Sequence, residues 1–255
     1  MKCPALAGRR MPRRSQRRHF QKTGRRGGQG GARYALTVAG HRQEFDRELE
    51  AIEARVIELF AMIAEDLPQA TQALLTGNNE ALGILTERQR AIHSLYPQIE
   101  KLASREILLH APVASDLRFL LSVLQILPDL ERSHHSVVEI AGRASRSLSE
   151  DLSPRCREII ERMGNLIAGM WRQAADSWCQ RDHTAVLALN ERDDEMGDLH
   201  ASLIAELASG RMTLPVTMDM TLVACFYQRL GDHAVNIARR VTYLAGSDTG
   251  KPSDR

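Results

Sequence analysis

Two stretches of the chain, almost one hundred residues apart, carry polar side chains at helical spacing. Between residues 222 and 245, Gln228, Asp232 and Asn236 recur every four residues and therefore share one face of a helix. These three side chains place oxygen atoms close together along that face. Residues 127–144 repeat the pattern 97 positions earlier, with these equivalent pairs: Glu131 and Gln228, Arg132 and Arg229, His135 and Asp232, Glu139 and Asn236.

A second match shows that the similarity extends beyond one helix. The run Asn190-Glu191-Arg192 corresponds to Thr86-Glu87-Arg88 at an offset of 104 residues. The chain is therefore an internal duplication. Apolar residues spaced by three and four predict six long helices. The first four lie at about 45–77, 80–109, 112–148 and 154–180, the fifth ends near residue 209, and the sixth begins at Pro215.

Composition favours helices packed on helices. Aromatic residues make up only 4% of the chain, whereas sheets are usually rich in aromatic and β-branched residues. The expected fold is all-α, with two tandem three-helix bundles. The expected organisation is a disordered Arg/Gly-rich leader at 1–41, a first three-helix repeat at 42–149, a second at 150–247 and a disordered tail at 248–255.

The charges are unevenly distributed along the chain. Residues 1–40 contain 11 Lys or Arg and no acidic residue, which leaves 23 basic and 32 acidic residues in the remainder, a net charge of −9. An acidic body argues against nucleic acid as the main partner. No uncharged apolar run reaches about 18 residues, so no membrane span is expected. The four cysteines lack close spacing, which argues against a zinc site or disulfide framework and favours the cytoplasm.

Two alternative functions arise from the histidines. The unit Glu131-x-x-His134 is typical of di-iron four-helix bundles, which would make the protein a metalloenzyme, although such sites require a second copy of the unit. His134 and His135 are also candidates for the acceptor of a histidine phosphotransfer module. No glycine-rich phosphate loop and no nucleophile motif supports an enzyme.

Four motifs together resemble the PhoU family in its actinobacterial type, over about residues 42–247. They are APVASDLR at 111–118, LERSHHSVVEIA at 130–141, DDEMGDLH at 193–200 and QRLGDHAVNIARRV at 228–241. The resemblance implies a cytoplasmic, usually dimeric regulator without enzymatic activity. Such a protein restrains the high-affinity phosphate ABC transporter, by contact with its ATPase, and the membrane sensor histidine kinase of the Pho system. The positions that match the family motifs are Asp116, Arg118, Arg132, Arg229 and Asn236.

The resemblance also implies a metal site, because several family members hold metal clusters at E/D-x-x-x-D motifs. No cofactor is required, but a divalent cation or iron cluster in the second repeat would be held by Asp194, Asp198, Gln228 and Asp232. Gln228 replaces the usual glutamate and should weaken binding. In the first repeat, Arg90 and Ser94 stand at the positions that correspond to Asp194 and Asp198, which leaves Glu131 and His135 as the candidate ligands. An arginine beside them favours an ion pair between Arg90 and Glu131 over a metal.

Overall fold

The computed structural model describes residues 30–146 and 151–244, and their side chains from residue 40 to residue 144 and again from residue 151 onward. Within these ranges the chain is helical and contains no strand, which confirms the all-α prediction. The elements are α1 (Gly30–Thr76), α2 (Glu80–His110), α3 (Ala114–Gly142), the 3₁₀ turn η2 (Arg143–Arg146), α4 (Pro154–Gln180), α5 (Ala185–Ala208) and α6 (Leu214–Leu244).

The first helix begins earlier than the apolar pattern predicts. Helix α1 starts at Gly30, so residues 30–41 of the expected leader are helical. No proline interrupts this segment, and the helix continues through it without an apolar stripe, although Gly30, Gly31 and Gly40 are poor helix formers. The rest of the leader, residues 1–29, and the expected tail, 248–255, lie outside the described residues.

The helix ends follow local backbone chemistry. Ser153 caps α4, because its hydroxyl oxygen accepts a hydrogen bond from the backbone N–H of Cys156 at 3.0 Å, and Pro154 occupies the first turn. Helix α2 ends at His110 and α3 begins at Ala114, two residues after Pro112. Ala111 and Ala114 both have positive φ angles, which a continuous right-handed helix does not allow, so the two helices are separate. The helices α1, α2 and α3 continue through their internal prolines.

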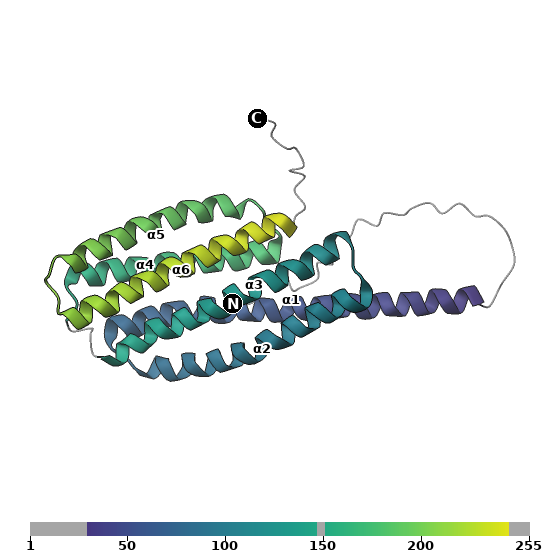
Figure 1. The fold of residues 1–255 in the computed structure, drawn as a ribbon, viewed down its shortest axis with the longest axis horizontal. Coiled ribbons are helices and arrows are strands. Elements are labelled where there is room, and N and C mark those ends of the chain that lie inside the picture. The colour runs from purple at the N-terminus through teal and green to yellow at the C-terminus, as the bar shows by residue number, and fades with distance from the viewer. Residues whose placement is uncertain (1–29, 147–150, 245–255) are drawn as a thin grey trace, which may run out of the picture.

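The two three-helix units pack side by side in antiparallel fashion (Figure 1). Helices α1, α3, α4 and α6 form the centre, in which α1 packs on α4 and α3 packs on α6. Helix α2 covers α1 and α3 on one side, and α5 covers α4 and α6 on the other. The pairs Glu53–Arg181 and Thr71–Gly164 show that α1 and α4 run in opposite directions.

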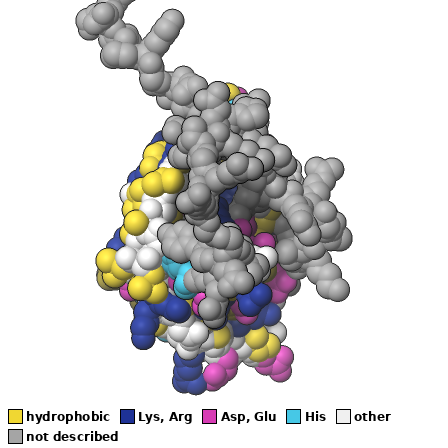
Figure 2. Space-filling model, turned by 90° about the vertical axis from the view of Figure 1, so that its right-hand side faces the viewer, with side chains coloured by type: hydrophobic (Ala, Val, Ile, Leu, Met, Phe, Trp, Pro, Cys, Tyr) yellow, Lys and Arg dark blue, Asp and Glu magenta, His cyan; other side chains and the backbone are white. Residues whose placement is uncertain are grey.

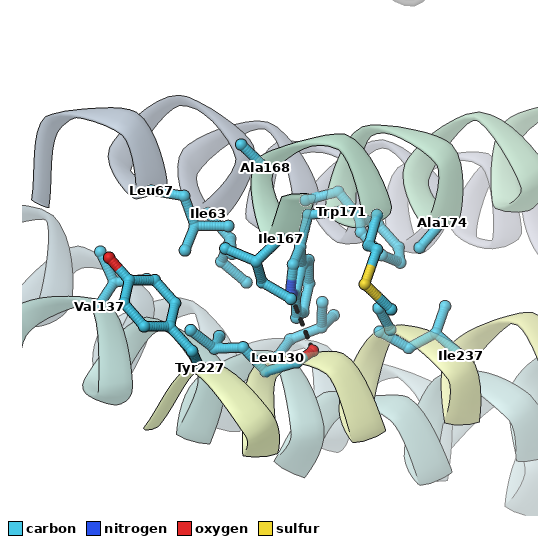
Figure 3. Close-up of a cluster of buried hydrophobic side chains, with 14 of the residues drawn as sticks. Ile63, Leu67, Leu130, Val137, Ile167, Ala168, Trp171, Ala174, Tyr227 and Ile237 are labelled. Carbon is cyan, nitrogen blue, oxygen red and sulfur yellow. Dashed lines mark hydrogen bonds between the residues drawn. The ribbon is translucent and has the colours of Figure 1, made fainter. Parts of the chain in front are cut away.

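One core extends across both units. Figure 3 shows side chains from all four central helices meeting around Trp171, which is fully buried. The Trp171 indole N–H donates to the backbone carbonyl of Leu230 at 3.2 Å, and its ring lies 6.2 Å from that of Phe60. The labelled neighbours are Ile63 and Leu67 of α1, Leu130 and Val137 of α3, Ile167, Ala168 and Ala174 of α4, and Tyr227 and Ile237 of α6.

The buried positions confirm the duplication residue by residue. Helices α1 and α4 bury matching positions at an offset of 104, as in Leu67 and Trp171, and α2 and α5 keep the same offset, as in Leu85 and Leu189. Helices α3 and α6 match at an offset of 97. The repeat predicted from motifs is therefore a repeat of the packing.

The surface mixes charges of both signs with scattered apolar side chains. Figure 2 shows this at one end of the molecule, where hydrophobic side chains lie beside basic and acidic ones. None of the described helices is both long enough and apolar enough to cross a membrane.

Candidate functional site

The first unit contains a buried charge cluster. Asp66 of α1 and His134 of α3 are both fully buried, and the imidazole Nε2 lies 2.8 Å from the Asp66 carboxylate. Arg88 of α2 forms an ion pair with the same carboxylate and a longer one, at 3.4 Å, with Glu65. Three helices are thus joined by a single buried carboxylate, which is stable only because both neighbours donate to it.

The polar residues predicted in the first unit are divided among different partners. Glu131 lies 2.7 Å from His93, and His135 lies 3.0 Å from the Gln89 amide. Arg90 pairs instead with Glu87, one turn earlier on its own helix. The predicted ion pair between Arg90 and Glu131 is therefore wrong, because a carboxylate three residues away on the same helix is closer to the arginine.

The structure also bears on the di-iron enzyme and the histidine phosphotransfer module, the two alternative functions. Glu131 contacts His93, whereas His134 is enclosed in the core against Asp66, so the two do not face a common point. A fully buried imidazole cannot accept a phosphoryl group from another protein. His135 is exposed but carries no neighbouring carboxylate in a described contact, only the Gln89 amide.

In the second unit, the acidic residue that faces α6 is Asp193. Its Oδ1 atom is buried, has no hydrogen-bond partner within the described part of the chain, and lies beside Gly231, where a Cβ atom would approach to 2.6 Å. Burial raises the pKa of the Asp193 carboxyl, and the charges of Asp232 and Asp194 raise it further. Asp194 and Asp198 are exposed on the solvent side of α5, one residue out of register with this contact.

The remaining predicted ligands lie on α6. Asp232 and Asn236 are exposed and Gln228 is half-buried. Asp232 directly follows Gly231, which the Asp193 carboxylate approaches, but the structure does not gather all four predicted ligands at one point. Within the described ranges, His, Cys, Asp and Glu side chains form no group of three that is placed to hold a metal ion.

The two units meet where α3 crosses α6. The Ser133 hydroxyl lies 2.7 Å from Nδ1 of His233, and Asp129 lies 3.9 Å from Nε2. Burial lowers the pKa of His233. The negative charges of Asp129 and Asp232 oppose this effect, whereas the positive charges of Arg132 and Arg229 add to it. Burial in this seam therefore favours the neutral form of the imidazole.

The other motif positions have mainly structural surroundings. Asp116 accepts from Arg42 at 3.0 Å and thereby ties α3 to α1. Nε of Arg118 is buried without a partner among the described residues. Arg132 and Arg229 are exposed.

Sequence reasoning did not identify Asp66 or Asp193 as important. A signal for Asp66 was available, because it occupies a core position between Ile63 and Leu67, where a charged residue requires a buried partner. For Asp193 the signal was its position four residues after Leu189, a fully buried residue of α5, because residues at this spacing lie on the same face of a helix. The spacing of the aspartates does not show which of them faces α6, whereas their direction relative to Leu189 does.

Comparison with known proteins agrees with the repeated three-helix fold. The family profile of the PhoU domain matches residues 56–144 and again residues 160–241. The chain belongs to the PhoU family. Each match spans parts of the three helices of one unit, so the PhoU domain and the structural repeat coincide.

Relatives and solved structures of PhoU proteins extend over most of the chain. The phosphate-specific transport system accessory protein PhoU homolog 1 of Mycobacterium tuberculosis is 29% identical over 80% of this chain and 93% of its own length. The homolog from Zymomonas mobilis is 30% identical over 81% of this chain and 87% of its own. The crystal structure of PhoU from Pseudomonas aeruginosa superposes with a TM-score of 0.74 at 25% identity, and covers 79% of this chain and 99% of that one.

Proposed function

We propose that the protein is a phosphate-signalling regulator that restrains a high-affinity phosphate ABC transporter and the sensor histidine kinase of the Pho system by direct contact. The observation that carries the proposal is the presence of a PhoU domain in each half, with relatives named as accessory proteins of phosphate-specific transport. The transporter ATPase and the kinase are the expected partners. The protein would work in the cytoplasm, as a homodimer and without enzymatic activity.

An exposed apolar stripe supports a role in docking. Leu214, Met218 and Leu222 follow one another every four residues on α6 and keep 71%, 60% and 46% of their surface exposed. Leu121 of α3 holds the position equivalent to Met218 and is also exposed. Side chains of this kind on the repeated third helices suit contact with a partner protein. Binding that favours one state of the transporter or kinase would shift its population toward that state.

Deletion of the gene tests this proposal. Loss of the restraint should leave phosphate-starvation genes switched on in phosphate-rich medium, at a level close to that of starved wild-type cells. Quantitative transcript measurement in replete and starved cultures checks this, and re-expression of the gene should restore repression. Continued repression in the deletion strain would show that this chain does not carry the role.

We further propose that any divalent cation taken up by the protein binds between α5 and α6 of the second unit. Asp232 and Asp193 supply carboxylates there, and Gln228 supplies a neutral oxygen, with Asp194 and Asp198 on the adjoining turn. A cation would remove the repulsion that raises the pKa of Asp193.

The expected result is that Asp232→Asn abolishes metal binding while Glu131→Gln leaves it intact. Calorimetric titration with Mn²⁺ or Fe²⁺ measures both variants against the wild type. Loss of binding in Glu131→Gln alone would place the site in the first unit instead. If the wild type binds no metal, Asp232→Asn should be neutral or slightly stabilising, because it removes a like charge from beside Asp193.

A further inference from the structure

The duplication provides an internal comparison at one arginine. Arg88 of α2 and Arg192 of α5 occupy equivalent positions 104 residues apart. In the first unit, Arg88 is neutralised by two carboxylates of α1. Because α1 and α4 keep the same offset of 104, these two carboxylates have direct counterparts in α4: Gly169 in place of Glu65 and Met170 in place of Asp66.

Arg192 has therefore lost both of its expected partners. Among the described residues, no Asp or Glu lies within 4.0 Å of its guanidinium. Gly169 leaves room for this group, since a Cβ atom there would lie 3.1 Å from Nη1 of Arg192. The second unit thus keeps the arginine close to α4 but has removed the negative charge that balances it in the first.

A groove of about 500 Å³ lies between α4 and α5 at this arginine. Arg172, at the position equivalent to Pro68, adds a second cation that the first unit lacks, and it too has no ion pair among the described residues. Gln173 also lines this space, and its buried Oε1 atom accepts no hydrogen bond from any of the described residues. We call this space the α4–α5 groove.

Two carboxylates also line the α4–α5 groove. Asp182 is already engaged, because its carboxylate accepts from the backbone N–H and the hydroxyl of Thr184 at the start of α5. Asp176 is exposed. The guanidinium groups of Arg172 and Arg192 suit an anion. The carbonyl oxygen of Gln173 and the carboxylate of Asp176 suit a hydroxyl donor on the same anion.

We propose that the α4–α5 groove binds a phosphoryl group, either as inorganic phosphate or as a phosphate monoester. Its anionic oxygens accept from Arg172 and Arg192, in the paired geometry that guanidinium groups favour for phosphate. A hydroxyl of the phosphate, or of the ester, donates to Oε1 of Gln173. Sulfate carries no proton at neutral pH and cannot make this bond, so the groove should discriminate against it.

The choice of phosphate among oxyanions rests on the proposed function, whereas the anion site itself rests on the comparison of Arg88 with Arg192. The two ideas are tested separately. The regulatory role is measured by transcripts in cells, and anion binding is measured on the purified full-length protein.

Calorimetric titration with inorganic phosphate, glycerol 3-phosphate and sulfate at pH 7 tests the site. The wild type should bind at least one of the two phosphates more tightly than sulfate. Arg192→Gln should weaken that binding tenfold or more, because it removes charge-assisted hydrogen bonds. Gly169→Glu should have an effect of similar size, since it restores a carboxylate beside Arg192 as in the first unit.

Matched variants separate charge from shape and from misfolding. Gly169→Gln has nearly the size of Gly169→Glu without its charge, and should weaken binding less. Arg162→Gln removes an exposed arginine of α4 outside the groove and should bind as the wild type does. The proposal is overturned if the wild type binds neither phosphate, if sulfate binds equally well, or if folded Arg192→Gln keeps wild-type affinity.

Discussion

Trp171→Ala is expected to lower the free energy of unfolding by about 4 kcal/mol, because it opens a cavity at the centre of the core. Trp171 is fully buried where both units meet, and its loss also leaves the carbonyl of Leu230 without its indole donor. Leu67→Ala, at the equivalent position of the first unit, should cost about 3 kcal/mol for the same reason.

Both substitutions should shift the same unfolding transition. Urea denaturation followed by circular dichroism and by the fluorescence of Trp178 checks this, because Trp178 is fully buried and remains in the variant. Leu187→Ala is the control: Leu187 is 69% exposed, so its loss should change stability by less than about 0.5 kcal/mol. Two separate transitions, of which Trp171→Ala moves only one, would mean that the units unfold independently.

Arg88→Gln is expected to destabilise the protein by about 3 kcal/mol, because it leaves the Asp66 carboxylate in the core with one charged neighbour fewer. The carboxylate is fully buried, and the only other described side chain bonded to it is His134. Thermal and chemical denaturation of the purified variant measure the effect.

Arg192→Gln is the matched control for this substitution. The same change is made at the equivalent position, but no carboxylate depends on this arginine among the described residues. Its stability in the absence of added anion should stay within about 0.5 kcal/mol of wild type. Equal losses of stability in Arg88→Gln and Arg192→Gln would contradict the difference in ion pairing between the two units.

The helices could be predicted from the sequence because apolar spacing and proline positions are local signals. Helix α4 was predicted to within a residue at both ends, since Pro154 and the buried stripe mark it clearly. Helix α1 was not, because residues 30–41 carry no apolar stripe to define where the helix begins.

The candidate site was predicted less well, for a geometric reason. Successive residues of a helix point about 100° apart, so a motif read one position out of register faces another direction. Asp194 and Asp198 have the spacing of a ligand pair, yet Asp193 is the residue that reaches α6. The cluster of Asp66, Arg88 and His134 joins three helices, and its members are linked only by tertiary packing that the sequence does not display.

The antiparallel pairing of α1 with α4 and of α3 with α6 also bears on the ancestry of the chain. A single three-helix ancestor would have exposed the faces that these pairs now bury, and could have covered them by forming a twofold-symmetric dimer. In such a dimer every substitution occurs twice. Fusion of two such copies would remove that constraint, because one half can then keep Arg88 paired with a buried carboxylate while its counterpart Arg192 has Met170 in place of that carboxylate.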